Sequence, residues 1–317
     1  MNVHAILLAK LHETAYDEPV IEYEFGDDMF MENDILSMIE REIPSFSKGQ
    51  RLIAKYILEN YDKAAFMTAG KLGKTVGVSE STVVRFASEL GYEGYPEMRK
   101  VLQEVVRKKL TIVQRIEVAS EQIDEHNLVD SVMSADAERI QATLERIDQA
   151  DFDKAVNSII NGKHVYIIGT RSSASLALFF GYYLRLMMEN VHVVQDTAAS
   201  EIIEQLFRVG AGDVVVGISF PRYSSRTLAA VKYAKSKGAT VVGITDGETS
   251  PLAGVSDVNL YAKSDMISFI DSLVAPMCLL NALLAEIGYR SRENISETFR
   301  RLEDVWSEYA MFLTDEH

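Results

Sequence analysis

Short apolar runs alternate with helical stretches through the second half of the chain, and this alternation restricts the possible folds more than any other feature. An apolar run of about four to eight residues between turn residues is typical of a strand buried on both faces. A helix between two such strands makes a parallel connection, so we expect an α/β domain of three layers around a five-stranded parallel sheet. The expected strands are residues 165–168, 191–194, 214–218, 240–244 and 258–261.

Helical patterns fill the intervals between these strands and also precede and follow the sheet. Apolar residues recur there at the spacing of one helix face. We assign the whole α/β domain to residues 128–317. The expected helices are 128–148, 151–161, 172–188, 199–208, 225–237 and 268–286.

The distribution of charge separates the remainder of the chain into parts. The net charge of the protein is −15, yet residues 45–109 carry 12 lysines and arginines against 7 acidic residues, and residues 1–44 carry 2 against 11. A basic module on an acidic body can bind nucleic-acid phosphates, although a chance local excess explains the same numbers. We divide this half into a weakly ordered acidic extension at 1–31, a helical domain at 32–109 and a linker at 110–127.

Residues 69–86 have the pattern of two short helices joined by a tight turn. Thr68 and Ser79 are favourable N-cap residues for the two helices. Helices that cross tightly need a small residue at the crossing, which Gly73 provides, and the turn needs a residue that tolerates positive φ, which Gly77 provides. This is the stereochemistry of an α-helical helix-turn-helix domain. The residues expected to face its core are Leu72, Val76, Val78, Val83 and Phe86.

The second helix of this pair begins with short polar side chains, as a recognition helix does where it meets base edges and phosphates. Arg85, one turn beyond Ser81, is placed to bind a guanine edge or a phosphate. A helical pair without a nucleic-acid role has similar turn chemistry, but it does not explain why the motif falls in the basic part of the chain. We therefore predict that the domain binds a double-stranded DNA operator. The predicted DNA-binding residues are Lys71, Ser79, Ser81, Thr82 and Arg85.

Two hydroxyl-rich loops, 169–175 and 219–227, each follow an expected strand and lead into a helix. Carboxyl ends of parallel strands meet at one edge of a sheet, where α/β proteins bind ligands. Hydroxyl groups and free backbone N–H groups at a helix start favour an anion, although serines that only cap the helices explain one such loop equally well. Two loops with arginines favour a ligand site, and the first of them is neither a Walker loop nor a dinucleotide fingerprint. The predicted ligand-binding residues are Gly169, Thr170, Arg171, Ser172, Ser173, Ser219, Arg222, Ser224, Ser225 and Thr227.

Residues 45–109 resemble the N-terminal domain of RpiR/MurR-type regulators, through the motifs at 65–68, 78–86 and 90–95. Residues from about 130 to 286 resemble the SIS (sugar isomerase) domain that these regulators carry. The resemblance implies a homodimeric or homotetrameric regulator of carbohydrate genes, whose SIS domain senses a phosphosugar. It also implies which hydroxyl groups bind the phosphate: those of Ser173, Ser219, Ser224 and Thr227.

Both loops depart from the family pattern. Thr170, Arg171 and Ser172 stand where typical members have more glycine, and in the second loop Ser225 replaces a glycine. Residues 220–223 lengthen that second loop. Arginine pairs with either a phosphate or a carboxylate, so both remain possible effectors.

A sugar-phosphate isomerase with an attached DNA-binding domain is the alternative function. Aldose–ketose isomerisation needs a general base beside the substrate carbons. His164 and His192 are expected at strand starts, at the opposite edge of the sheet from the loops. Glu201 is the remaining candidate, and we interpret it as a favourable charge near a helix N-terminus. We expect no enzyme activity, no catalytic residue and no metal site.

The location of the protein follows from its cysteine content and its apolar runs. A single cysteine, Cys278, cannot form an intrachain disulfide and is typical of a reducing compartment. No apolar run near the N-terminus approaches the ~20 residues of a membrane span. We expect a cytoplasmic protein with no membrane partner and no cofactor.

Overall fold

The computed structural model describes residues 35–109, 111–116, 127–195, 199–266, 270–309 and 311. The chain divides into two compact units, Met1–Val105 and Val106–His317. The acidic extension expected at residues 1–31 lies outside the described residues. Within the described residues, no helix is long and apolar enough to cross a membrane.

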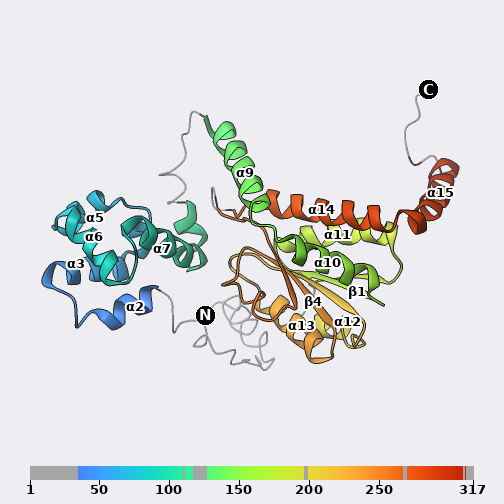
Figure 1. Cartoon of the computed structure of the whole chain (residues 1–317), viewed down its shortest axis with the longest axis horizontal. Coiled ribbons are helices and arrows are strands. Elements are labelled where there is room, and N and C mark those ends of the chain that lie inside the picture. Colours follow the sequence, from blue (N-terminus) through green and yellow to red (C-terminus); the bar gives the residue numbers. More distant parts are fainter. Residues whose placement is uncertain are drawn as a thin grey trace, which may run out of the picture. The chain divides into compact units, whose positions relative to one another are not determined.

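The first unit is helical (Figure 1). Its helices are α2 (Ile35–Glu42), α3 (Lys48–Glu59), α4 (Tyr61–Ala64), α5 (Ala69–Val76), α6 (Glu80–Glu89) and the start of α7 (Tyr95–Lys109). Apolar faces of these helices meet in one small core, in which the rings of Phe46 and Phe86 lie 5.0 Å apart. Fully buried members of this core are Ile39, Ile53, Ile57, Leu72, Val83 and Met98.

The second unit is built on a five-stranded sheet in the order β2-β1-β3-β4-β5, and every pair of neighbouring strands is parallel. The strands are β1 (Val165–Gly169), β2 (Val191–Val194), β3 (Val214–Ile218), β4 (Thr240–Thr245) and β5 (Val258–Tyr261). All residues of β1 and β3 are buried, because helices cover both faces of the sheet. The predicted α/β fold with five parallel strands is confirmed.

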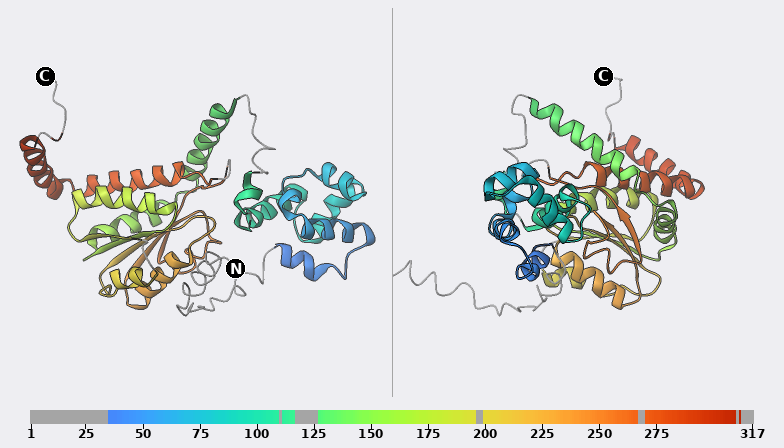
Figure 2. Two further views of the ribbon diagram at one scale, coloured as in Figure 1. Left: turned by 180° about the vertical axis from the view of Figure 1, so that it is seen from behind. Right: turned by 60° about the vertical axis from the view of Figure 1, so that its left-hand side comes forward.

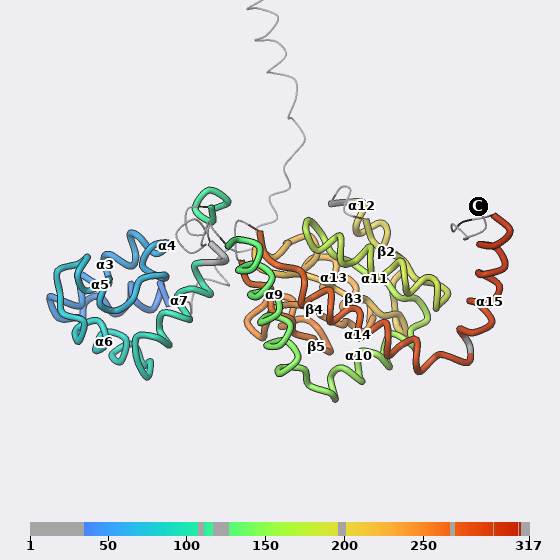
Figure 3. Tube along the Cα trace, turned by 90° about the horizontal axis from the view of Figure 1, so that it is seen from above, coloured from blue at the N-terminus to red at the C-terminus, as the bar shows by residue number. Residues whose placement is uncertain are grey.

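Helices form the outer two layers (Figures 1 and 2). The helices α10 (Gln149–Asn161), α11 (Ser173–Met187) and α14 (Val274–Arg290) cover one face, and α12 (Ala199–Gln205) and α13 (Ser225–Ser236) cover the other. Alternate residues of β1 divide between the two cores: Val165 and Ile167 face the first layer, whereas Tyr166 and Ile168 face the second. Figure 3 looks onto the first layer, with the strands behind it.

Two further helices flank this sandwich. The helix α9 (Leu128–Leu144) precedes α10 and packs against α14, and α15 (Arg292–Glu308) follows α14. The prediction of a helix over 268–286 is wrong at its start, because α14 begins only at Val274. The chain before it turns back on itself instead: Met266 pairs with Asp271 in an antiparallel bridge, and the Ser264 hydroxyl donates to the Ser272 carbonyl at 2.9 Å.

Candidate DNA interface and anion site

The helix-turn-helix is formed by α5 and α6, and the N-caps lie where the sequence predicts them. The Thr68 hydroxyl accepts a hydrogen bond from the Lys71 backbone N–H at 3.2 Å, and the Ser79 hydroxyl accepts one from the Thr82 N–H at 3.3 Å. Such caps satisfy backbone donors that a helix start leaves unpaired. They fix the first turn of α6, from which the predicted DNA-binding side chains project.

The two predicted glycines set the geometry of the turn. Gly77 has φ of 76°, in the left-handed region that favours glycine, and ends α5. A Cβ atom on Gly73 would lie 2.9 Å from the Val78 carbonyl oxygen, so only glycine allows α5 to approach the turn this closely. Leu72, Val83 and Phe86 are fully buried as predicted. Val76 and Val78 are only partly buried, because they flank the turn at the edge of this small core.

Three of the predicted DNA-binding hydroxyls form one cluster at the start of α6. The Ser79 hydroxyl lies 2.8 Å from that of Ser81 and 2.8 Å from that of Thr82. Ser79, Ser81 and Arg85 are exposed, so they can contact a ligand without rearrangement of the core. Lys71 is also exposed, on α5, and no hydrogen bond among the described residues joins its side chain to this cluster.

One apolar residue on this face is not among the predicted DNA-binding residues. Val84 is 41% exposed and shares the outer face of α6 with Ser81, Arg85 and Ser88, at intervals of three and four residues. Exposed apolar side chains on a recognition helix can contact thymine methyl groups in the major groove. The helical spacing that places Val83 and Phe86 inward identifies Val84 as an outward residue, and this signal was available from the sequence.

The two hydroxyl-rich loops meet at the carboxyl edge of the sheet. The chain leaves β1 to form β2 on one side and returns to form β3 on the other, so the β1 and β3 loops lie at the point where the strand order reverses. Open α/β sheets bind their ligands at this point. The buried hydroxyls of Thr170 and Thr227 lie 3.1 Å apart and join the first loop to α13.

The first loop depends on Gly169 at the end of β1. A Cβ atom there would lie 2.5 Å from the Ser173 carbonyl oxygen and 2.9 Å from its carbonyl carbon. The turn is closed further by a hydrogen bond from the Ser173 N–H to the Thr170 carbonyl at 3.2 Å. The loop therefore folds tightly over the strand end and presents the start of α11 to the site.

The predicted hydroxyls differ in their surroundings. Ser173 and Ser219 are each 5% exposed, and neither hydroxyl has a hydrogen-bond partner among the described residues. Ser224 caps α13 and accepts from the Thr227 N–H at 3.4 Å. Ser172 and Ser225 are exposed. The first two hydroxyls can therefore bind a ligand without first breaking a hydrogen bond to a described residue.

Two of the three arginines in these loops occupy backbone positions that favour glycine. Arg171 has φ of 56° and Arg222 has φ of 62°, both in the left-handed region. A non-glycine residue there costs about 1 kcal/mol, and such strain is concentrated at functional sites. No ion pair or hydrogen bond with a described residue holds either guanidinium group. Both groups can therefore bind an anion.

Replacing Arg171 with glycine is expected to change stability and anion binding in opposite directions. Relief of the left-handed strain should raise the free energy of unfolding by about 0.5–1 kcal/mol. Loss of the guanidinium group should weaken anion binding by about tenfold or more. Denaturant titration and calorimetric titration measure the two effects. The matched control is Arg171→Ala, which keeps the Cβ atom and should lose binding without the gain in stability. Equal stability of the two variants would contradict the role of strain.

The wall of the site includes residues that the sequence analysis did not select. The Tyr223 hydroxyl donates to both oxygens of Asp246, at 2.9 and 3.1 Å, and the Thr245 hydroxyl donates to the Ser219 carbonyl at 2.7 Å. Thr245 is the last residue of β4 and Asp246 follows it, and the carboxyl end of this strand lies at the same edge as the two loops. Their position after a predicted strand was the available signal.

Two residues considered as catalytic bases lie away from this arrangement. His164 and His192 lie at the amino ends of β1 and β2, with Nδ1 of the first 3.4 Å from Nε2 of the second. Burial, His164 and Arg185 lower the pKa of His192. Glu201 is exposed in the first turn of α12. The described residues contain no cluster of three metal-ligating side chains.

Known protein families account for both units. Residues 33–109 match the helix-turn-helix domain of the rpiR family, and residues 158–286 match the SIS domain. The chain belongs to the RpiR family of transcriptional regulators. HexR of Pseudomonas aeruginosa, an HTH-type transcriptional regulator, is 24% identical over 280 residues, which cover 86% of this chain and 95% of HexR. An uncharacterised HTH-type regulator of Clostridium perfringens is 26% identical over 260 residues, covering 80% and 91%.

Solved structures of related proteins agree with the fold of this RpiR-family regulator. The sugar isomerase domain of an RpiR transcription factor from Sphaerobacter thermophilus is 28% identical, with a TM-score of 0.54, and covers 56% of this chain and 99% of its own. NanR of Vibrio vulnificus, solved in complex with ManNAc-6P, is 22% identical with a TM-score of 0.54 and covers 86% and 97%. The chain is thus a DNA-binding regulator with a SIS domain.

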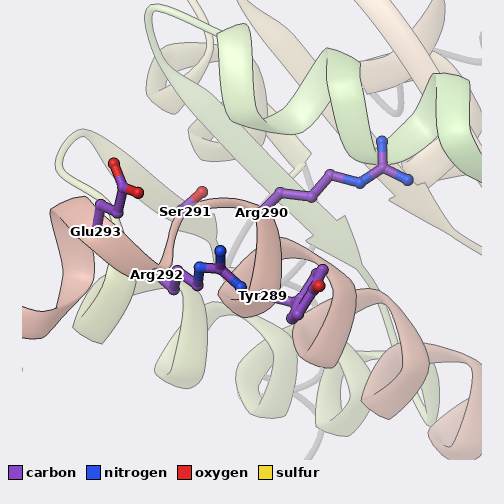
Figure 4. Close-up of a pocket in the computed structure, with 5 residues that line it drawn as sticks. All are labelled: Tyr289, Arg290, Ser291, Arg292 and Glu293. Atoms are coloured by element: carbon purple, nitrogen blue, oxygen red, sulfur yellow. The ribbon is translucent and has the colours of Figure 1, made fainter.

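A separate hollow of about 390 Å³ lies at the junction of α14 and α15 in this regulator (Figure 4). Five consecutive residues, 289–293, line it. Figure 4 shows Arg290 extending away from the other four, and this arginine is bound by Asp153 at 2.5 Å and Glu286 at 2.6 Å. None of the residues that line this hollow belongs to the loops after β1 and β3, so it is distinct from the candidate anion site.

Proposed function

We propose that the protein regulates carbohydrate genes by binding an operator through α6 and a phosphorylated sugar through the loops after β1 and β3. The observation that carries the proposal is the meeting of these loops at the Thr170–Thr227 contact. The two loops joined by this contact bear hydroxyl groups, the start of a helix and the arginines Arg171 and Arg222. Phosphate is the common metabolite group that such a donor set fits best, and NanR, which has the same fold, was solved with a phosphosugar.

We further propose that two copies associate through the outer side of α11 and α14, which places two recognition helices on one operator. Leu178, Tyr182 and Tyr289 are 56%, 57% and 66% exposed on these two neighbouring helices. Exposed large apolar side chains on neighbouring helices are typical of a protein–protein interface, and closed twofold symmetry is the commonest arrangement of identical subunits. A second copy of the chain fits both requirements.

A thermal-shift screen of the full chain tests the effector class. A phosphorylated sugar at 100 times its Kd should stabilise the sensor by about 2.7 kcal/mol. Replacing both Ser173 and Ser219 with alanine should remove this shift without lowering the melting temperature of the free protein, because neither hydroxyl has a partner among the described residues. Ser236→Ala, at the other end of α13, is the control and should keep the shift.

The screen also includes the unphosphorylated sugars, inorganic phosphate and small carboxylates. These compounds show whether the site recognises a phosphate group or a carboxylate group. A shift with carboxylates alone would exclude a phosphosugar effector, and no shift with any anion would exclude the proposed site. Incubation of the same sugar phosphates with the protein tests the isomerase alternative. Substantial conversion that Glu201→Gln abolishes would contradict a purely regulatory function.

A further inference from the structure

The helical turn at residues 112–116 buries its charged side chain and exposes its apolar ones. It follows α7 and begins with reciprocal hydrogen bonds between Thr111 and Gln114. Arg115 is only 1% exposed, whereas Ile112, Val113 and Ile116 are 51%, 65% and 51% exposed. Burial of a charged group is costly unless a partner of opposite charge is present. The position of Arg115 is therefore explained by its partner and not by the hydrophobic effect.

That partner is Asp271, which lies 156 residues further along the chain. Nη1 of Arg115 donates to both carboxylate oxygens at 2.9 Å. The Asp271 side chain is 19% exposed, so water screens this ion pair only weakly. The pair attaches the segment that leads out of the DNA-binding domain to the loop between β5 and α14.

The next residue in this loop makes a second attachment. The Ser272 hydroxyl donates to Asp136 of α9 at 2.6 Å, and Asp136 also pairs with Arg139 at 3.2 Å. Consecutive loop residues thus bind two parts of the chain that precede the sheet: Asp271 binds residues 111–116, and Ser272 binds α9. Because β5 is parallel to the other strands, this loop leaves the sheet at the same edge as the anion site.

The Asp271 carboxylate also lies within the electrostatic field of the anion site. Burial raises its pKa, whereas Arg115 and, to a smaller extent, Arg222 oppose that rise. Arg222 belongs to the loop after β3, where we place the effector. An anion bound beside Arg222 would offset the positive charge that Arg222 presents to Asp271, and it would repel the Asp271 carboxylate.

We propose that Asp271 is shared between Arg115 and the effector site, so that an anion bound beside Arg222 weakens the attachment of residues 111–116. Arg115 is a positioning residue in this scheme, because it acts through Asp271 and does not touch the effector. The inference rests on the proposed function and adds the connection between its two sites. Coupling between two ligands is reciprocal, so operator binding would change effector affinity by the same factor.

The double variant Arg115→Met, Asp271→Asn tests this connection, because it removes both charges of the ion pair together and does not leave one of them buried without the other. Operator affinity is measured by fluorescence anisotropy with a duplex that the wild-type protein selects from a random library. The effector is the phosphosugar with the largest thermal shift. Saturating effector should change wild-type operator affinity by about 5- to 150-fold, and that of the double variant by less than about twofold. The double variant should also bind the effector more tightly, since the repelling carboxylate is gone.

Tighter effector binding is a result that a merely structural role of the pair would not produce. The matched control is Arg290→Met, Asp153→Asn, which removes an ion pair between α14 and α10 and should respond as the wild type does. Arg115→Lys keeps the charge without the planar guanidinium group and should show a partial response if the double variant fails to fold. A wild-type response in the folded double variant, or in Arg115→Lys, would overturn the connection alone. Absence of any response in the wild type would overturn the proposed function and the connection with it.

Discussion

Replacing Arg85 with alanine is expected to weaken operator binding by about 5- to 150-fold, the range for loss of one bidentate contact to a guanine. The guanidinium group is exposed on the outer face of α6, one turn beyond the hydroxyl cluster of Ser79, Ser81 and Thr82. It contributes nothing to the core formed by Val83 and Phe86, so the fold should not change. Fluorescence anisotropy with the selected operator and with a scrambled duplex measures the loss.

The scrambled duplex and the salt dependence separate two kinds of contact for Arg85. If Arg85 contacts a base, the variant loses affinity for the operator alone. If it contacts a phosphate, the variant loses affinity for both duplexes, and the slope of the logarithm of affinity against the logarithm of salt concentration becomes smaller by about one. Lys63→Ala removes an exposed positive charge from α4 and is the control for net charge. An equal loss in the two variants would show that α6 is not the recognition helix. The thermal shift with the effector should be the same in Arg85→Ala as in the wild type.

Replacing Gly169 with alanine is expected to abolish effector binding and to lower the free energy of unfolding by about 1–3 kcal/mol. The added Cβ atom would meet backbone atoms of Ser173 at 2.5 and 2.9 Å, and backbone cannot move aside as a flexible side chain does. The turn must open, which moves the Ser173 hydroxyl and the first N–H groups of α11 away from the anion. Thermal denaturation with and without the phosphosugar measures both effects.

Gly210→Ala is the matched control for this substitution in the same unit. Its Cβ atom would meet only the Lys237 carbonyl oxygen at 4.0 Å, an ordinary contact, so stability and effector binding should stay close to the wild-type values. Binding of the operator by Gly169→Ala without effector should be unchanged, since the α5–α6 pair lies in the other unit. Effector binding by Gly169→Ala at wild-type strength would mean that the anion does not lie over the β1 loop.

The parallel sheet was predictable because each strand is a short apolar run that both layers of helices bury. The caps of α5 and α6 were predictable for a related reason: Thr68 and Ser79 act on backbone groups only three residues away. Local chemistry decides such features, and it can be read from the sequence. The predicted start of α14 was wrong because the turn before it depends on the Ser264–Ser272 hydrogen bond, and no local pattern marks that bond.

The candidate anion site was predictable in its loops but not in its wall or its surroundings. Serines and arginines after β1 and β3 were visible as hydroxyl-rich segments. Asp246 was not selected, because a single aspartate after a strand is common and its partner, Tyr223, lies 23 residues away. Arg115 stands in a segment expected to be a linker, and its ion pair joins residues 156 positions apart. Contacts of that range depend on the finished fold.

The sheet order also bears on how such a regulator can acquire a new effector during evolution. The loops that bear the candidate effector residues follow the central strands β1 and β3, whereas the loop that holds Arg115 and α9 follows the edge strand β5. Substitutions at positions such as Ser173 or Arg171 therefore do not change the backbone of the loop between β5 and α14. Such substitutions can change which metabolite fits the candidate site while the Arg115–Asp271 ion pair and the Ser272–Asp136 hydrogen bond stay in place.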